Sequence, residues 1–552
     1  MFLVKAAGLL LLTALAAVAA AASLLVRVEI ASDSDIETAA ALNAACLARF
    51  DGWFLARVHT DGLSALSDRL HCRVLDSAVE GKRYVYAFVE PDFDRQRLYG
   101  CGAVLTEDRE GALLCVTAEG IRKLTRMQVE LCGVSTEPVR TSSAAGPSSF
   151  APRPATPSSD SDSLIWQLMA RASQDSAEAV LRRLIAFRTR YALTDSCWAA
   201  SNWFRQKLVE YGCDSTYLDT FHIPDVAASV NIVGVRRGRV NPNRIHIVCG
   251  HIDDASEIPE TFAPGSDDNA SGAGLVLEAA RIFQGVEFDY TVWFVGFGAE
   301  EFGLVGSDTF ARECRDRGDT IVLAINHDMD SYGTAGRDSI RVVGKRADPP
   351  CSTWVEYYMA MADTFTDLKC LREIVDDQGS SDQHSFWDYG YTAIRDRYLD
   401  RDPVYHTTGD TIGPYQFYWC GTNNIPMYTE AIKATVATVA RLAGAHAETT
   451  GVSETGLVPR RAILSVLPTV GRAPVLVRLS SAYAAVSVYD ASGRRIRILA
   501  EPQPLFPDHY SGTSGLRVVA CWDGRDLSGA RVSPGVYYFR AAAASARFVL
   551  AE

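Results

Sequence analysis

Histidine, aspartate and glutamate side chains that could bind metal and transfer protons follow several apolar stretches of this chain. Five of them are candidate metal ligands: His251, Asp268, Glu301, Asp328 and His406. Glu300, directly before one of these ligands, is a candidate proton carrier. Imidazole nitrogens and carboxylate oxygens together suit zinc in proteins. The residue types therefore predict metal-dependent acid–base chemistry.

The first candidate ligand follows a strand pattern. Residues 244–250 are mostly apolar and β-branched and lead into His251, with Asp253 two residues further on. Because a strand repeats its facing every second residue, both side chains leave the strand end on one side, where the Asp253 carboxylate can orient the imidazole. Alone, this pair is a weak signal, since most such histidines have structural roles.

A glycine-rich turn at 263–272 contains Asp267, Asp268 and Asn269, and a helix pattern starts at Gly274. One interpretation is that an aspartate of this turn bridges two cations. The alternative is that these side chains only cap the helix. Both interpretations place the turn at a helix start.

Two further apolar strands end in acidic residues. Residues 290–298 lead into Glu300 and Glu301, and residues 321–327 lead into Asp328. Open α/β sheets place their chemistry at the carboxyl ends of their strands. His406 follows later in a polar loop. The stretches together predict an α/β domain whose strand ends hold a pair of metal ions.

Five motifs of the chain resemble those of the co-catalytic zinc metallopeptidases of clan MH, which include secreted leucyl aminopeptidases, aminopeptidase Y and glutamate carboxypeptidase. The motifs are Gly-His-Ile-Asp at 250–253, Pro-Gly-Ser-Asp-Asp-Asn-Ala-Ser-Gly at 264–272, Gly-Ala-Glu-Glu-Phe-Gly-Leu-Val-Gly-Ser at 298–307, Asn-His-Asp-Met-Asp at 326–330 and Tyr-His-Thr-Thr-Gly-Asp-Thr at 405–411. The resemblance covers residues 163–447. It implies a three-layer α/β domain with a central mixed, mostly parallel sheet.

The resemblance also implies roles for the candidate residues. His251, Asp268 and Asp328 would bind one Zn²⁺ and Glu301 and His406 the other, with Asp268 bridging the two ions. Glu300 would activate a zinc-bridging hydroxide, and Asp253 would support His251. One position departs from the family, because Gln383 stands where a histidine is usual. That histidine is not a zinc ligand, so the departure concerns substrate contacts.

The function implied by the resemblance is that of a secreted zinc-dependent exopeptidase, above all an aminopeptidase. The alternatives are a carboxypeptidase or a glutaminyl-peptide cyclotransferase-like enzyme on the same fold, or a non-catalytic receptor-type relative. The expected partner is a peptide or protein substrate. A net charge of −13 and a pI near 5.4 argue against nucleic acid as a partner.

The N-terminus predicts export. Lys5 precedes a leucine- and alanine-rich run with small residues before Ser23, which is typical of a signal peptide over residues 1–22. We therefore expect a protein that is secreted or held at the cell surface. An uncleaved membrane anchor is the alternative.

The region before the zinc-peptidase motifs divides into a domain and a linker. Residues 23–140 predict a small α+β domain of two related halves, since strand-then-helix patterns start near residues 24 and 83. It is a pro-region that covers the active site, an adaptor or a merely structural module. Residues 141–162 are rich in serine and proline and predict a linker.

Residues 448–552 contain short alternating strands separated by turns, which favours an Ig-like β-sandwich. Tyr489-Asp-Ala-Ser-Gly and Trp522-Asp-Gly-Arg-Asp are similar to the Ig-like domain of the flagellar hook-capping protein FlgD and to C-terminal sorting domains of secreted bacterial enzymes. That similarity implies contact with the cell surface or the secretion machinery.

The chain has thirteen cysteines, so at least one thiol of the monomer is unpaired. Cys197 and Cys213 flank a helix predicted over 198–211. Because this helix would separate them by roughly 24 Å, we expect that they do not form a disulfide with each other.

Overall fold

The computed structural model describes residues 23–136, 159–447 and parts of 464–550, except residues 33, 334–338, 347, 376–380, 400–401 and 413–422 in the first two ranges. The predicted signal peptide and most of the predicted linker lie outside the described residues. The chain divides into two compact units, residues 1–449 and 450–552. Among the described residues, no helix combines the length and apolar character that crossing a membrane requires.

The N-terminal region contains two four-stranded antiparallel sheets with matching strand orders, β2-β3-β1-β4 and β6-β7-β5-β8. Each belongs to a strand–helix–strand–strand–helix–strand unit, a split βαβ arrangement. The first unit consists of β1 (Ser23–Glu29), α1 (Ser34–Ala41), β2 (Ala45–Phe50), β3 (Trp53–His59), α2 (Leu63–Ser67) and β4 (Cys72–Asp76). The second consists of β5 (Arg83–Phe88), η1 (Arg95–Gly100), β6 (Gly102–Glu107), β7 (Gly111–Val116), α3 (Ala118–Leu124) and β8 (Glu130–Val134). We call the latter the second N-terminal unit.

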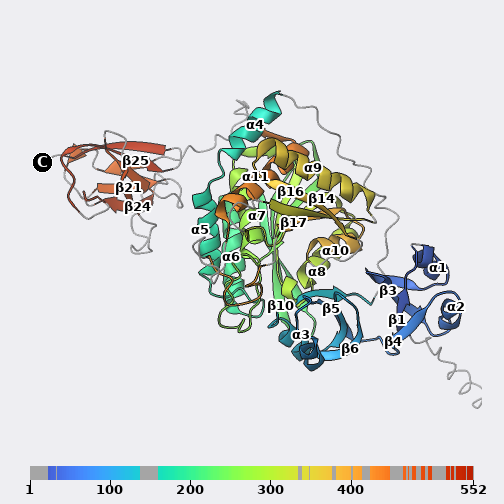
Figure 1. The fold of residues 1–552 in the computed structure, drawn as a ribbon. Coiled ribbons are helices and arrows are strands. Elements are labelled where there is room, and N and C mark those ends of the chain that lie inside the picture. Colours follow the sequence, from blue (N-terminus) through green and yellow to red (C-terminus); the bar gives the residue numbers. More distant parts are fainter. Residues whose placement is uncertain are drawn as a thin grey trace, which may run out of the picture. The chain divides into compact units, whose positions relative to one another are not determined.

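An eight-stranded mixed sheet forms the centre of the following domain, in the order β16-β15-β17-β14-β11-β13-β10-β9 (Figure 1). Its central strands β17, β14, β11 and β13 are parallel. The strands are β9 (Ser215–Ile223), β10 (Ala227–Arg236), β11 (Asn241–His251), β13 (Tyr290–Phe297), β14 (Thr320–His327), β15 (Ser339–Lys345), β16 (Lys369–Val375) and β17 (Ala393–Tyr398). Strands β12 (Val286–Phe288) and β18 (Ala445–Ala447) form a separate pair.

Helices form a layer on each face of this sheet, so the predicted three-layer α/β fold is confirmed. One layer contains α4 (Ser159–Met169), α5 (Gln174–Ile185), α6 (Asp195–Glu210), α7 (Ala270–Ile282), α9 (Pro349–Phe365) and α11 (Ile425–Leu442). The other contains α8 (Val305–Arg317) and α10 (Gln383–Asp388), which contact each other. Helix α4 starts inside the predicted linker, which therefore ends before Ser159.

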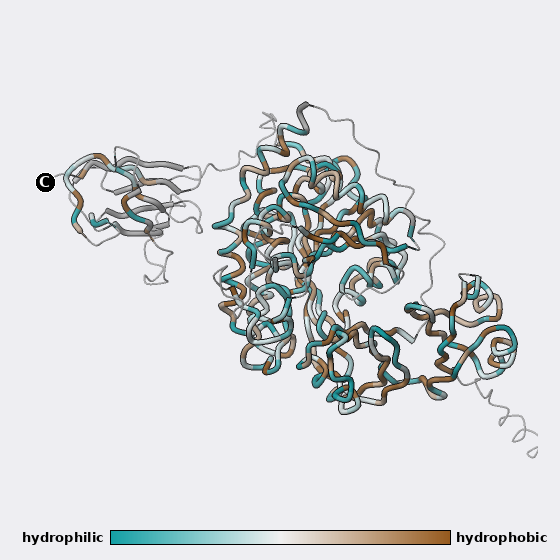
Figure 2. Tube along the Cα trace, in the orientation of Figure 1, coloured by the Kyte–Doolittle hydropathy of each residue, from teal (hydrophilic) through white to brown (hydrophobic). Residues whose placement is uncertain are grey.

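Burial explains why the central strands are almost continuously apolar. Residues Ile245–His251 of β11 are all buried, as expected for a strand covered by helices on both faces. Hydrophobic residues follow the strands of the central sheet in Figure 2. Helix α7 also packs on all sides, and a Cβ atom at Gly272 would collide with the His327 carbonyl oxygen. This glycine lets the start of α7 approach the end of β14 closely.

Helices α6 and α7 both begin a few residues before the predicted positions. Helix α6 begins at Asp195, where the Thr194 side chain accepts a hydrogen bond from the Cys197 backbone, so Cys197 lies inside the helix. Cys197 and Cys213 are both free thiols, so they do not form a disulfide with each other. Helix α7 begins at Ala270, earlier than the apolar pattern predicts, because Asn269 caps it by accepting from Gly272 N–H.

The C-terminal unit contains a three-stranded and a five-stranded sheet. The first consists of β19 (Leu464–Leu467), β21 (Val475–Leu479) and β24 (Arg517–Trp522). The second consists of β20 (Val470–Gly471), β26 (Ala544–Leu550), β25 (Gly535–Ala541), β22 (Val486–Tyr489) and β23 (Arg495–Leu499). Trp522 is buried and its ring lies 4.9 Å from that of Tyr537, which joins the two sheets. The assignment of this unit as Ig-like stays a prediction.

Candidate metal centre

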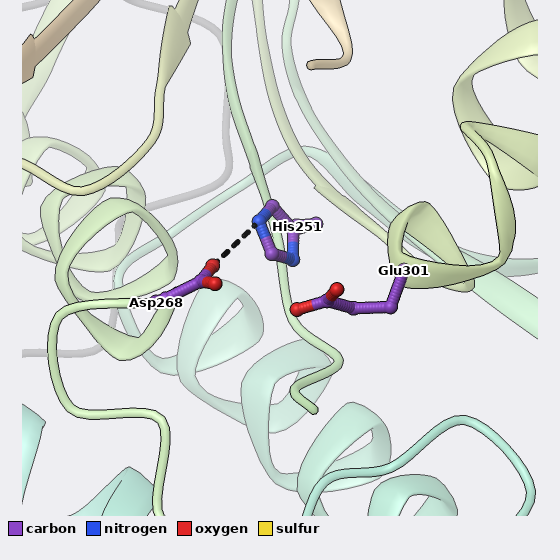
Figure 3. A group of neighbouring side chains, drawn as sticks. All are labelled: His251, Asp268 and Glu301. Atoms are coloured by element: carbon purple, nitrogen blue, oxygen red, sulfur yellow. Dashed lines mark ion pairs between the residues drawn. The ribbon is translucent and has the colours of Figure 1, made fainter. Parts of the chain in front are cut away.

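The five predicted ligands come together at the carboxyl ends of the central strands. His251 ends β11, Asp328 directly follows β14, and Glu301 lies in the short helix η2 (Glu300–Phe302) after β13. Asp268 lies in the turn before α7, and His406 comes from a loop far along the sequence. All five side chains are buried. Figure 3 shows His251, Asp268 and Glu301 pointing toward a common centre.

Asp268 lies between the two histidines. Its Oδ1 is 3.3 Å from His251 Nε2, and its Oδ2 is 3.0 Å from His406 Nε2. His251 Nε2 is also 3.4 Å from Asp328 Oδ1, and His406 Nε2 is 2.8 Å from Glu301 Oε2. Each imidazole therefore faces one oxygen of Asp268 and one further carboxylate. This is the arrangement of a carboxylate that bridges two cation positions.

The spacing and chemistry of these atoms fit a divalent cation such as zinc. Ligand atoms about 2.0–2.1 Å from a tetrahedral zinc ion lie about 3.3 Å apart, close to the distances above. His251, Asp268 and Glu301 form a group that could hold an ion, and Asp328 lies 3.4 Å from His251 Nε2. Glu301 Oε1 is buried without a hydrogen-bond partner, so it has a lone pair to offer.

The electrostatics of the site also favour a cation. Burial raises the pKa of Glu301 to about 7, although His406 opposes the shift. Burial alone would lower the pKa of His406. The negative charges of Glu301 and Asp268 have the larger combined effect and raise this pKa well above its usual value. The surrounding carboxylates thus favour protons on both imidazoles, since the pKa of His251 is also raised. Divalent cations would replace these protons, because a metal-bound histidine must be neutral.

Glu300 is buried beside the His251 and Asp328 pair. Burial raises its pKa well above the usual value, and the nearby carboxylates of Glu301 and Asp382 raise it further, against the opposing effect of His251. A carboxylate with a raised pKa accepts a proton more readily near neutral pH. This geometry suits the predicted proton carrier.

The structure gives Asp253 a different contact from the expected one. His251 Nδ1 is 3.1 Å from the Asp253 backbone oxygen, whereas the carboxylate Oδ1 is 3.8 Å away. The carboxylate instead accepts hydrogen bonds from Glu300 N–H at 3.1 Å and Glu301 N–H at 3.3 Å. Asp253 therefore supports His251 through its main chain and holds the two-glutamate turn through its side chain. The strand alternation could not reveal this second contact.

Two further side chains support the site. Asp410 accepts hydrogen bonds from the backbone of Asp267 at 2.9 Å and Asp268 at 3.0 Å. Arg395 Nη2 lies 3.0 Å from Asp328 Oδ2. Asp410 belongs to the Tyr-His-Thr-Thr-Gly-Asp-Thr motif, so the sequence carried a signal for it. Arg395 had none, because its role depends on β17 pairing with β14.

Two residues near the candidate ligands, Asp267 and Gln383, have structural contacts. Asp267 Oδ1 accepts from Ser331 N–H, Ser331 Oγ and Tyr332 N–H at 2.8–2.9 Å, so it braces the loop after β14. Gln383 Oε1 accepts from Asn326 Nδ2 at 3.1 Å. Gln383, at the position that departs from the family pattern, therefore packs against β14.

At the carboxyl ends of a mixed α/β sheet, the chain thus gathers two imidazoles and several carboxylates around Asp268, an arrangement suited to binding a metal ion. In agreement, residues 231–416 match the model of peptidase family M28. The matched segment includes all five candidate ligands and Glu300.

Curated relatives are similar to about a third of the chain. A probable zinc metalloprotease of Pyrenophora tritici-repentis is 28% identical over 190 residues, which is 30% of this chain and 44% of that protein. Aminopeptidase YwaD of Bacillus subtilis is 28% identical over 191 residues, which is 33% of this chain and 40% of that protein. The chain thus spans less than half the length of either relative.

Among solved structures, the LapA aminopeptidase of Legionella pneumophila aligns with a TM-score of 0.49 and 19% identity, covering 66% of this chain and 98% of LapA.

Proposed function

We propose that this protein is a zinc-dependent exopeptidase that removes N-terminal residues from peptides. The observation that carries the proposal is Asp268, whose two carboxylate oxygens face two different buried imidazoles while Glu300 lies beside them. When bound, zinc ions supply the positive charge that polarises a carbonyl and lowers the pKa of water. His251, Asp268, Asp328, Glu301 and His406 would hold them.

The chain's own residues supply the proton transfer. The Glu300 carboxylate accepts the proton of the attacking water, and the same group donates it to the departing amine as the peptide bond breaks. Asp253 fixes the backbone of Glu300, so the carboxylate is already oriented when a substrate binds. No proton needs to leave the site during a cycle.

The charge around the site supports action at the amino end of a peptide. A free ammonium group is stabilised by carboxylates, whereas a C-terminal carboxylate requires a cation. Among the described residues, Arg395 lies at the site, but it is paired with Asp328 at 3.0 Å and with Glu130 at 3.4 Å. This pairing favours aminopeptidase over carboxypeptidase activity.

A peptide digest tests the proposal. The purified protein is incubated with a peptide and with its N-acetylated form, and the products are followed by mass spectrometry. We expect stepwise loss of N-terminal residues from the free peptide and none from the acetylated one. Shortening from the carboxyl end, or conversion of N-terminal glutamine to a cyclic product, would support the carboxypeptidase or cyclotransferase alternative instead.

The variant Glu300→Gln tests the catalytic assignment. We expect it to keep its zinc, since Glu300 is not among the five ligands, and to lose activity by roughly 10²- to 10⁴-fold because the proton acceptor is gone. Metal analysis and turnover rates measure both properties. Glu313→Gln, at a partly exposed glutamate of α8, is the matched control. Unimpaired turnover of Glu300→Gln would refute the role.

We further propose that the protein is exported and that the C-terminal unit contacts the cell surface or the secretion machinery. The signal-like composition of residues 1–22 supports this, and cleavage is expected before Ser23. N-terminal sequencing of protein from the medium or the cell surface should give a start near Ser23. An intact Met1 on cytoplasmic protein would contradict export.

A further inference from the structure

The second N-terminal unit contacts several of the chain segments that carry the candidate metal centre. Its residues Met127, Gln128, Glu130 and Gly133 make hydrogen bonds or an ion pair with these segments. They lie at the end of the unit, in β8 and in the turn that precedes it. The contacts were not predicted, because they join residues that are far apart in the sequence.

The first contact determines the tautomer of His406. Its Nε2 faces Asp268 and Glu301, so its other nitrogen, Nδ1, must find a partner elsewhere. That partner is the Met127 backbone oxygen, at 3.1 Å. A carbonyl oxygen only accepts, so Nδ1 carries the proton and the lone pair of neutral His406 lies on Nε2, toward the metal position.

A second contact fixes the loop that carries His406. Gln128 Nε2 donates to the Tyr405 backbone oxygen at 2.9 Å. The Tyr405 ring in turn stacks on the His406 ring with centroids 3.8 Å apart. His406 itself adopts a left-handed backbone conformation with φ of 53°, which a non-glycine residue keeps only where its surroundings hold it. The second N-terminal unit supplies part of that support.

A third contact reaches the other side of the metal centre. Glu130 Oε1 is 3.4 Å from Arg395 Nη1, and Arg395 Nη2 is 3.0 Å from Asp328 Oδ2. The positive charge of Arg395 is thus shared between Glu130 and a candidate zinc ligand. Without Glu130, the Arg395 guanidinium would interact more strongly with Asp328 and would compete more strongly with a cation for its oxygens.

The unit and the catalytic domain also share one hydrophobic core. Ile121, Leu124 and Leu131 belong to the same buried cluster as Tyr191 and Phe302. Around this cluster, Arg83 donates to the Phe302 backbone oxygen at 2.8 Å. Gly133 N–H donates to the Gly303 oxygen at 3.2 Å. Phe302 and Gly303 directly follow Glu301. These contacts therefore help to fix the position of the turn that carries Glu300 and Glu301.

We propose that the second N-terminal unit is a permanent part of the metal centre, with the Met127 carbonyl, Gln128 and Glu130 as positioning groups. It is neither a cover that must be removed for activity nor a separate adaptor. The inference rests on the proposed metal site, but not on which end of a peptide the enzyme attacks.

Zinc affinity measured on point variants tests the proposal. Glu130→Ala and Gln128→Ala should each weaken zinc binding about tenfold or more in competition with a chelator, as is typical when support behind a metal ligand is lost. The matched controls are Glu119→Ala and Gln96→Ala, at exposed positions of the same unit. The melting temperature of the metal-free protein should match that of the controls. Zinc affinity within twofold of the controls for both variants would overturn the proposal.

Cleavage of the full chain gives an independent test if a variant folds poorly. A specific protease site is introduced into the predicted linker near residue 150, and the cut protein is analysed by size-exclusion chromatography and metal analysis. We expect the two fragments to stay together with zinc bound, or the catalytic fragment to lose zinc if they are forced apart. A catalytic fragment that separates and keeps its zinc and activity would overturn the proposal.

These measurements separate the inference from the proposed function, because zinc binding is read without any substrate. A protein that binds zinc, loses it in the Glu130 variant and cleaves no peptide would refute the exopeptidase proposal and leave the positioning role standing. If the Glu130 and Gln128 variants cleave peptides as well as the controls and keep the same zinc affinity, the positioning role would be refuted. The exopeptidase proposal would then stand.

Discussion

Two adjacent aspartates show how much the surroundings of one residue decide its role. Asp267 and Asp268 are both buried in the same turn. The Asp267 carboxylate accepts three hydrogen bonds from Ser331 and Tyr332, whereas the Asp268 carboxylate faces the two imidazoles. One aspartate therefore stabilises a loop, and the other is placed to bind metal.

This difference predicts opposite effects of one substitution. Asp268→Ala should abolish zinc binding at one or both positions, because the bridging ligand is removed. Asp267→Ala should keep zinc but lower the free energy of unfolding by about 1–3 kcal/mol for each buried donor left without a partner. Metal analysis and denaturant unfolding of the metal-free protein measure the two effects. Equal zinc loss in both variants would contradict the assignment.

At this scale the sequence predicted the candidate ligands but not all of their supports. His251, Glu301 and Asp328 could be located because residues that end neighbouring parallel strands must meet at one edge of a sheet. Asp268 and His406 lie in a turn and a loop, and their roles came from the motifs that resemble those of zinc metallopeptidases. The contacts of Arg395, and the side-chain contacts of Asp253, depend on which strands and turns become neighbours in space. Local periodicity contains no information on such pairings.

Among the elements, β11 carries both a candidate ligand and a buried histidine with no site role. His246 lies five residues before His251, and neither of its ring nitrogens has a hydrogen-bond partner. Burial, with a smaller contribution from Arg244, lowers its pKa to about 3. His246 is therefore neutral in the folded protein and takes up a proton on unfolding below its ordinary pKa.

Protonation of His246 in the unfolded state makes the free energy of unfolding depend on pH. Below about pH 6.5 the unfolded state binds one proton more than the folded state, so stability falls as the pH falls, by about 2 kcal/mol between pH 7 and 5. His246→Leu should remove this part of the dependence, whereas His222→Leu, at an exposed position of β9, should leave it unchanged. Denaturant unfolding at several pH values checks this, and parallel curves for both variants would contradict it.

Helix and strand positions were easier to predict than their ends. The strands that lead to the site were recognisable because buried parallel strands are continuous apolar runs. The starts of α6 and α7 were missed by a few residues, because Thr194 and Asn269 cap them through contacts that an apolar pattern does not show. The start of α4 was also missed, because it lies in a serine-rich stretch with little apolar content.

For the whole molecule, the division between residues 449 and 450 separates the candidate metal centre from the C-terminal unit. All the candidate ligands and their hydrogen-bonded supports described above lie within residues 1–449. The C-terminal unit has its own buried centre around Trp522. Catalysis and any attachment role are thus assigned to different units.

Deleting residues 450–552 should therefore leave zinc content and peptide turnover unchanged. The reason is that no described ligand or support of the metal centre is removed. Metal analysis, steady-state kinetics and the melting temperature of the shortened protein check this against the full chain. A loss of zinc or of turnover in a folded shortened protein would show that the two units depend on each other.

The contact between Met127 and His406, which are 279 residues apart, has a consequence for biosynthesis. His406 is the last of the five ligands to leave the ribosome, and its hydrogen-bond acceptor is made long before it. A growing chain therefore cannot assemble the complete centre until synthesis has passed this histidine. During most of its translation the chain would therefore lack the complete centre to which we assign peptide hydrolysis.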